Sequence, residues 1–316
     1  MFRQLIHLAI LSMLLSVFGC EQPPSFGLET PRPKLVVESN FTLDKAIQVY
    51  VSRSQFILEE EEEKEEYVLN ATVEIYEDDV YLETLEFVEP KSGLNEVPYY
   101  TTRNLVPKVN TIYTIQVEAP CCDPVMANSR IPNSISLLSA SISELSVGEG
   151  QEMENLLVTY LVRLSFEDPS EEKNYYHLSL LQQVHRYTLN EGGDTVITNS
   201  QLRSLVFNPE DNDNGRVAHF RGGLLVEDNA INNGKVISFE LPLNIKLKKN
   251  EEILGKLFLE LRAVTEDYYR YFSDLSRQKQ SSDSPFSEPV IIYDNIDGGL
   301  GIFAGYNSSL DSLYIQ

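Results

Sequence analysis

Apolar and polar residues alternate along much of the chain, and this period predicts β-strands. In AIQVYVSRSQFIL, Ile47, Val49 and Val51 alternate with more polar side chains, as on a strand with one buried face. Similar runs recur between turn-forming segments, for example at 77–79 and 191–194. Evenly spaced strands of this kind favour antiparallel β-sandwiches of immunoglobulin type. We therefore expect a mainly all-β protein.

Prolines divide the expected strands into two blocks. The first block, 33–119, holds several short strand candidates, and we predict an N-terminal immunoglobulin-like β-sandwich there. The segment 120–133 contains three prolines, which interrupt the pairing of central strands, so we expect a linker. Strand patterns resume afterwards and predict a second, C-terminal β-sandwich domain over 134–316.

One segment has a helical period instead. In TEDYYRYFSDLSRQKQ the apolar side chains fall on one face at helical spacing: Tyr268, Tyr271, Phe272 and Leu275. Thr265 can cap this segment, and acidic residues follow it in the first turn. We predict a short helix at about 265–280 whose apolar stripe packs in the core, with a binding strip as the alternative.

The first apolar run has the features of an export signal. LIHLAILSMLLSVFG follows Arg3 and is too short to cross a bilayer comfortably. It ends at Cys20, and residues 17–19 before it resemble a bacterial lipobox. We predict a signal peptide over 1–19, acylation of Cys20 with palmitate-type chains, and a proline-bearing tether over 20–32. The alternatives are a plain signal sequence and a cysteine inside a membrane anchor.

Charge narrows the choice of partners. The formal net charge is −23, whereas a nucleic-acid surface concentrates Lys and Arg, so we expect no nucleic-acid partner. The run EEEEEKEE at 59–66 contributes much of this charge. Such a run usually forms a solvated loop tip, and the alternative is an acidic docking patch for a cation or a basic partner.

The other two cysteines are adjacent, in APCCDP. Cys121 and Cys122 can close a small disulfide ring of strained geometry, and disulfides persist in the compartments that exported proteins reach. A vicinal disulfide and a pair of free thiols both fit the sequence. Zinc requires four ligands, and no matching His or Cys cluster follows in the sequence, so we predict no metal site.

Motifs for catalysis are missing from the sequence. His177, His185 and His219 fall on expected strands without a suitably spaced carboxylate or cysteine, and neither GxSxG nor SxxK occurs. The stretch DNDNG at 211–215 resembles an EF-hand start, but Gly222 stands where the bidentate Glu belongs, so we interpret it as a polar turn. We expect no cofactor and no enzyme activity, with a hydrolase of dispersed carboxylates as the alternative.

Several spaced stretches resemble one protein family. In order along the chain they are LVVES, ATVEIYED, ANSRIP, EDPSEEKNYYHLSL, DYYRYFSDLSRQ and SPFSEPVIIYDNIDGGLGIFAGY. With the lipobox, they resemble the domain-of-unknown-function family 4249, a family of exported outer-membrane lipoproteins of Bacteroidetes-type bacteria. The resemblance brings no catalytic residues. It implies an anchor in the outer membrane, on its surface or periplasmic face, close to TonB-dependent transporters of SusC type.

The last of these stretches has two interpretations. Gly298, Gly299 and Gly301 allow positive φ angles and close backbone approach, which indicates a structural role. The alternative is a partner-contact surface that includes these glycines and Phe303. Aromatic residues at 97–100 offer further contact area. We predict a non-catalytic accessory subunit of a TonB-dependent nutrient transporter, with a surface adhesin or envelope-structure protein as the alternative.

Overall fold

The computed structural model describes residues 32–55, 66–90, 96–150, 152, 154–170, 173–206, 216–228, 234–281 and 290–315. Residues from Pro33 onward belong to one compact unit. The described chain is mostly β-strand with one short helix near its C-terminal end, as the sequence predicted. The signal peptide, Cys20, nearly all of the tether, most of the acidic run and the DNDNG stretch lie outside the described residues.

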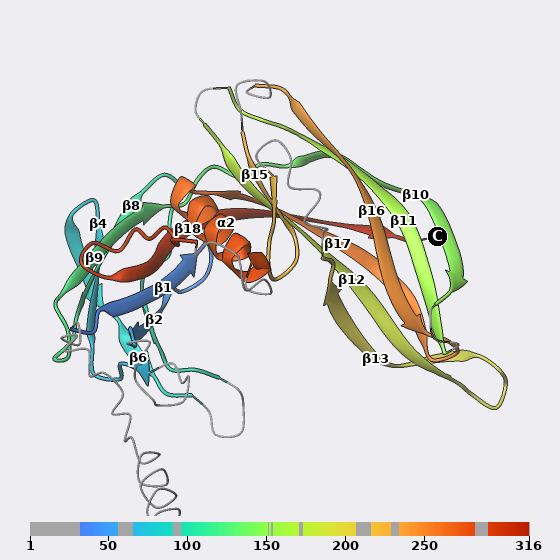
Figure 1. Ribbon diagram of the computed structural model, residues 1–316, viewed down its shortest axis with the longest axis horizontal. Coiled ribbons are helices and arrows are strands. Elements are labelled where there is room, and N and C mark those ends of the chain that lie inside the picture. The colour runs from blue at the N-terminus through green and yellow to red at the C-terminus, as the bar shows by residue number, and fades with distance from the viewer. Residues whose placement is uncertain are drawn as a thin grey trace, which may run out of the picture. The chain divides into compact units, whose positions relative to one another are not determined.

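The largest sheet runs through the whole unit (Figure 1). Its main path follows the order β14 (Arg216–Ala218), β15 (Leu224–Glu227), β12 (Tyr175–Leu189), β17 (Glu252–Val264), β18 (Leu300–Tyr314), β1 (Leu35–Phe41), β2 (Gln48–Arg53), β7 (Tyr99–Thr101) and β6 (Glu86–Val88). Two further strands pair off this path: β13 (Thr195–Ser204) with β12, and β3 (Glu66–Tyr67) with β2.

A four-stranded sheet packs on the inner face of β1 and β2. Its order is β5 (Val80–Thr84), β4 (Thr72–Glu77), β8 (Ile112–Glu118) and β9 (Val125–Arg130). The alternating residues predicted to be buried form the core between the two layers, with Val49 from β2 meeting Ile75 and Ile115. Strand β9 lies inside the expected linker 120–133, because Pro124 and Pro132 flank the strand instead of interrupting it.

A three-stranded sheet packs on β12 and β17 of the large sheet. It consists of β10 (Leu137–Glu149), β11 (Asn155–Glu167) and β16 (Val236–Lys248). Every second residue of β16 is buried, from Ile237 to Leu247. These side chains meet those of β12 and β17, such as Leu178 and Leu259, in a second core. Both halves of the chain are therefore two-layered.

Strand β18 belongs to both halves. It runs antiparallel to β17 and parallel to β1, with Gly301 beside Val37. Phe303 is buried in the first core, whereas Leu313 packs against the second. A parallel pair needs a long crossover connection, and here nearly the whole chain separates the two strands. The last strand in the sequence, β18, thus pairs with the first, β1.

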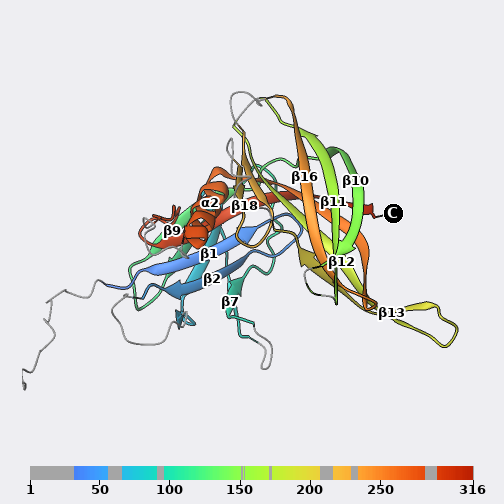
Figure 2. The ribbon, with the colours of Figure 1, turned by 45° about the vertical axis from the view of Figure 1, so that its right-hand side comes forward.

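The predicted helix is α2 (Glu266–Ser281), which packs against the large sheet (Figures 1 and 2). Thr265 caps it, because its Oγ1 accepts a hydrogen bond of 3.4 Å from the Tyr268 backbone N–H. The expected stripe is buried in a third cluster with Ile302 and Ala304 of β18. The helix therefore fixes one face of the junction between β17, β18 and β1.

Candidate functional site

The outer face of β1 and β2 forms the floor of a groove of about 610 Å³, which we call the tyrosine groove. The antiparallel register places Val36 opposite Ser52 and Glu38 opposite Tyr50. Strand β3 continues the floor, because Tyr67 lies opposite Ser52. Side chains at paired positions share one face of a sheet. The five side chains of this floor therefore turn away from the core: Val36, Glu38, Tyr50, Ser52 and Tyr67.

Residues from distant segments complete the tyrosine groove. Arg53, Gln55 and Val97 border it, and Arg221 reaches it from the turn between β14 and β15. The Arg53 guanidinium forms an ion pair with Glu66. That of Arg221 lies 5.0 Å from the centre of the Phe220 ring. The groove therefore combines guanidinium, carboxylate and amide groups with aromatic rings.

The tyrosines give the tyrosine groove an amphipathic floor. The ring of Tyr50 lies 5.9 Å from that of Tyr99, so a small aromatic surface continues onto β7. Burial, and then the neighbouring Tyr99, raise the pKa of the Tyr50 phenol, so its hydroxyl stays protonated at neutral pH. Flat rings with polar tips and a few polar groups around them are typical of binding sites.

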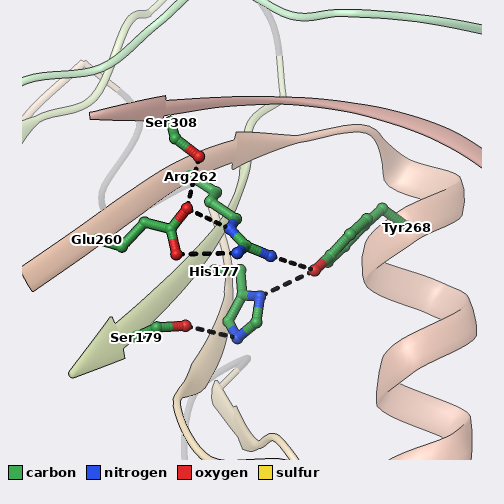
Figure 3. A network of polar contacts seen from close by, with 6 residues as sticks. All are labelled: His177, Ser179, Glu260, Arg262, Tyr268 and Ser308. Carbon is green, nitrogen blue, oxygen red and sulfur yellow. Dashed lines mark hydrogen bonds and ion pairs between the residues drawn. The ribbon is translucent and has the colours of Figure 1, made fainter. Parts of the chain in front are cut away.

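A network of polar contacts holds helix α2 on the sheet (Figure 3). The Tyr268 hydroxyl contacts His177 Nδ1 at 2.9 Å and accepts a hydrogen bond of 3.3 Å from Arg262. Arg262 also donates two hydrogen bonds of 2.8 Å to Glu260. Ser308 donates to the same carboxylate at 2.7 Å. Strands β12, β17 and β18 are thus joined to the helix.

The charged groups of the network are paired with each other. Glu260 and Arg262 lie two residues apart on β17, so both side chains project from the same face. Burial acts to raise the pKa of Glu260, but the Arg262 guanidinium and Ser308 outweigh it and hold that pKa below its usual value. A partly buried ion pair whose oxygens accept hydrogen bonds is a structural element, because losing either partner would leave a poorly solvated charge.

Two histidines lie ring to ring beside this network. The His177 and His219 rings are 4.6 Å apart, and the Arg221 backbone N–H donates to His219 Nδ1 at 3.2 Å. Burial, and then neighbouring charges, lower the pKa of His219 to about 4 and that of His177 well below its usual value. Both rings are neutral at pH 7, and they support the turn that carries Arg221 into the tyrosine groove.

A second concavity, of about 520 Å³, lies near the beginning of α2. Its charged lining residues are Arg130, Lys173, Glu266 and Asp267. Lys173 forms an ion pair with Glu227, and the Tyr293 hydroxyl donates to Asp267 at 2.5 Å. We take the tyrosine groove as the candidate site because Tyr50 and Tyr67 give it an amphipathic floor.

The structure places Gly301 in strand β18, whereas Gly298 and Gly299 lie in the turn before it. Gly301 has a φ of 110°, and a Cβ there would lie 2.1 Å from the Val37 carbonyl oxygen. A Cβ on Gly299 would lie 2.8 Å from the Leu35 carbonyl oxygen. Phe303 is fully buried and stacks on Phe41 with centroids 4.7 Å apart. These positions favour the structural interpretation, since the Phe303 side chain is not at the surface.

The two adjacent cysteines are free thiols in this structure, with their sulfur atoms 2.8 Å apart. Cys121 is exposed, whereas Cys122 is half-buried against the first core. Within the described ranges, no group of three or more His, Cys, Asp and Glu side chains is arranged to hold a metal ion.

Sequence reasoning found only part of the tyrosine groove. The aromatic stretch at 97–100 was expected to offer contact area, and Val97 borders the groove. Tyr50 and Ser52 had a signal, because they occupy outward positions of an alternating strand. No sequence pattern indicated that Arg221 would line the groove, because the turn that carries it lies near β1 only in the folded chain.

The fold and the tyrosine groove define a mostly β protein with a groove on its surface. The chain belongs to the family "Domain of unknown function (DUF4249)", whose model matches residues 21–311, and the resemblance seen in the sequence is thereby confirmed. A comparison with curated proteins finds no match. In the part of the chain that the structure describes, no helix combines the length and apolar character needed to cross a membrane.

Proposed function

We propose that the chain is a non-catalytic lipoprotein of the outer membrane that serves as a binding subunit of a TonB-dependent, SusC-type nutrient transporter. The tyrosine groove carries this proposal, because its rings and polar tips suit the capture of a cargo molecule or of a transporter loop. Its floor is a rigid strand pair, and a binding face that is already ordered loses little entropy on association.

The anchor in this proposal is Cys20. The apolar run before it has the length of a secretory signal, and a polar, proline-bearing tether of about a dozen residues follows it. Several acyl chains on one residue would hold the protein at a membrane surface. A tether between this anchor and the folded unit would let the unit reach a neighbouring β-barrel.

Affinity purification from detergent-solubilised outer membrane tests this function. The tagged native chain should bring down a TonB-dependent barrel in stoichiometric amount, and mass spectrometry should find Cys20 acylated at the mature N-terminus. The Cys20→Ala variant should lose the acyl chains and most of the barrel. Recovery of the wild-type chain alone, in a detergent that preserves other barrel complexes, would rule out the partnership.

A surface adhesin is the second candidate, and the hairpin of β12 and β13 favours it. In Figure 2 the end of this hairpin extends past the neighbouring strands. It exposes several apolar side chains: Leu189, Val196, Ile197 and Leu202. Exposed apolar groups gathered on one element indicate a contact surface. Loss of cell attachment after Leu202→Ser, with barrel recovery unchanged, would support adhesion.

A further inference from the structure

We propose that Cys121 and Cys122 form a reversible dithiol–disulfide couple, which exchanges with the disulfide of a small thiol or of another exported protein. The geometry points to it, because the two sulfur atoms lie 2.8 Å apart, closer than unbonded sulfur atoms normally approach. The proposal goes beyond ligand binding. Its cellular setting rests on the proposed export, since disulfides persist outside the cytoplasm.

The turn around the pair holds the sulfur atoms together. The Cys122 backbone N–H donates a hydrogen bond of 3.3 Å to the Ala119 carbonyl oxygen, which closes the turn after β8. The Cys122 side chain packs against the first core together with Ala119. Strand β9 begins three residues later, at Val125, and pairs with β8. The backbone on both sides of the pair is therefore fixed.

The two thiols have different roles. Cys121 is exposed, so a disulfide in solution can reach it, and its sulfur accepts the Cys122 S–H hydrogen bond. Burial, and then the bond to Cys121, raise the pKa of the Cys122 thiol to about 12. Because the thiolate is the attacking species, Cys121 is the first nucleophile and Cys122 is the resolving thiol.

The exchange occurs in two steps that balance. The Cys121 thiolate attacks one sulfur of the partner disulfide, a mixed disulfide forms on Cys121, and the other partner sulfur leaves as a thiolate. Cys122 then gives its proton to solvent, attacks the Cys121 sulfur and displaces the second partner thiolate. The pair loses two electrons and two protons, and the two partner sulfurs gain them.

One residue that lines the tyrosine groove lies within electrostatic reach of the couple. Arg53, which lines the groove, acts on Cys122 by lowering the pKa that burial raises. Asp123 acts in the opposite direction.

Thiol mapping of the reduced, purified full-length chain tests the couple with glutathione disulfide as the probe. Trypsin releases both cysteines in one peptide, 109–130, separate from Cys20. Wild-type protein should yield this peptide lighter by two hydrogens and without a glutathione adduct. A peptide that stays fully alkylated, or that retains glutathione, would overturn the proposal.

Single variants test the order of attack. Cys122→Ser should stop at a glutathione adduct on Cys121, whereas Cys121→Ser should react slower by a factor on the order of ten or more. In urea, where the turn is lost, the two variants should react at similar rates. Equal rates in the folded variants would contradict the assignment. Because this assay uses purified protein, its failure is distinct from a failure of the transporter partnership.

Discussion

The Tyr271 hydroxyl donates a hydrogen bond of 3.2 Å to the Glu38 carboxylate, and this contact joins helix α2 to the floor of the tyrosine groove. The two residues are separated by 233 positions in the sequence. Burial, and then Glu38, raise the pKa of Tyr271, so the phenol remains the donor at neutral pH. The helix therefore supports the groove directly as well as through the buried network.

Tyr271→Phe tests this link. The variant keeps the ring in its cluster and removes one hydrogen bond, so the free energy of unfolding should fall by about 0.5–1.5 kcal/mol in urea titrations. Tyr314→Phe is the matched control, because Tyr314 is exposed at the end of β18. A loss of equal size in both variants would show that the contact with Glu38 contributes nothing.

Gly301→Ala should destabilise the protein severely. The added Cβ would lie 2.1 Å from the Val37 carbonyl oxygen, and the φ of 110° is one that alanine rarely adopts. We expect a loss on the order of 3 kcal/mol or more in unfolding free energy. Gly148→Ala on β10 is the control, since its nearest neighbour would lie 4.0 Å away, and it should leave the melting temperature nearly unchanged.

Phe303→Ala should open a cavity in the first core. Phe303 is fully buried and stacks on Phe41, so truncation should cost about 3–5 kcal/mol. Leu310→Ala lies on the same strand but at an exposed position, and it should change stability by less than about 0.5 kcal/mol. Similar melting temperatures for the two variants would contradict the burial of Phe303.

Stability should fall as the pH falls from about 6.5 towards 4. The pKa of His219 is lowered to about 4 and that of His177 well below its usual value, so in this window the unfolded chain binds more protons at these sites than the folded chain does. Since the unfolded state binds more protons, each histidine contributes a slope of up to about 1.4 kcal/mol per pH unit.

Variants separate this effect from the titration of the many carboxylates. His219→Gln should reduce the slope of unfolding free energy against pH in this window. His185→Gln is the matched control, because the His185 ring bonds Ser200 outside the buried network. An unchanged slope in the first variant would show that His219 titrates normally in the folded protein.

Alternation along the chain predicted the strands and the helix because these elements bury one face each. It placed Ile47, Val49 and Val51 in the core correctly, and it found the stripe on α2. It did not predict the pairing of β1 with β18, because the partner of a strand is decided by tertiary packing across the whole chain. For the same reason it gave no sign that His177 and His219 would meet.

The tyrosine groove could be predicted only in part from the sequence, because its assembly also depends on tertiary packing. Tyr50 and Tyr67 alternate with buried residues or lie near them, so their outward direction was predictable. Their proximity to Arg221 was not, since it depends on where the turn between β14 and β15 comes to rest. The alternation within one strand predicts which face of the sheet a side chain occupies. The groove also depends on contacts between segments that are distant in the sequence, and alternation does not predict those contacts.

Photocrosslinking in living cells tests the central claim most directly. A photoreactive aromatic amino acid replaces Tyr50 in the tyrosine groove or, as the control, Tyr81, an exposed tyrosine on β5. We predict that the Tyr50 position crosslinks to a TonB-dependent barrel or to its cargo and that the Tyr81 position does not. Crosslinks from Tyr81 alone, or none from Tyr50 while the protein is folded and acylated, would contradict the account.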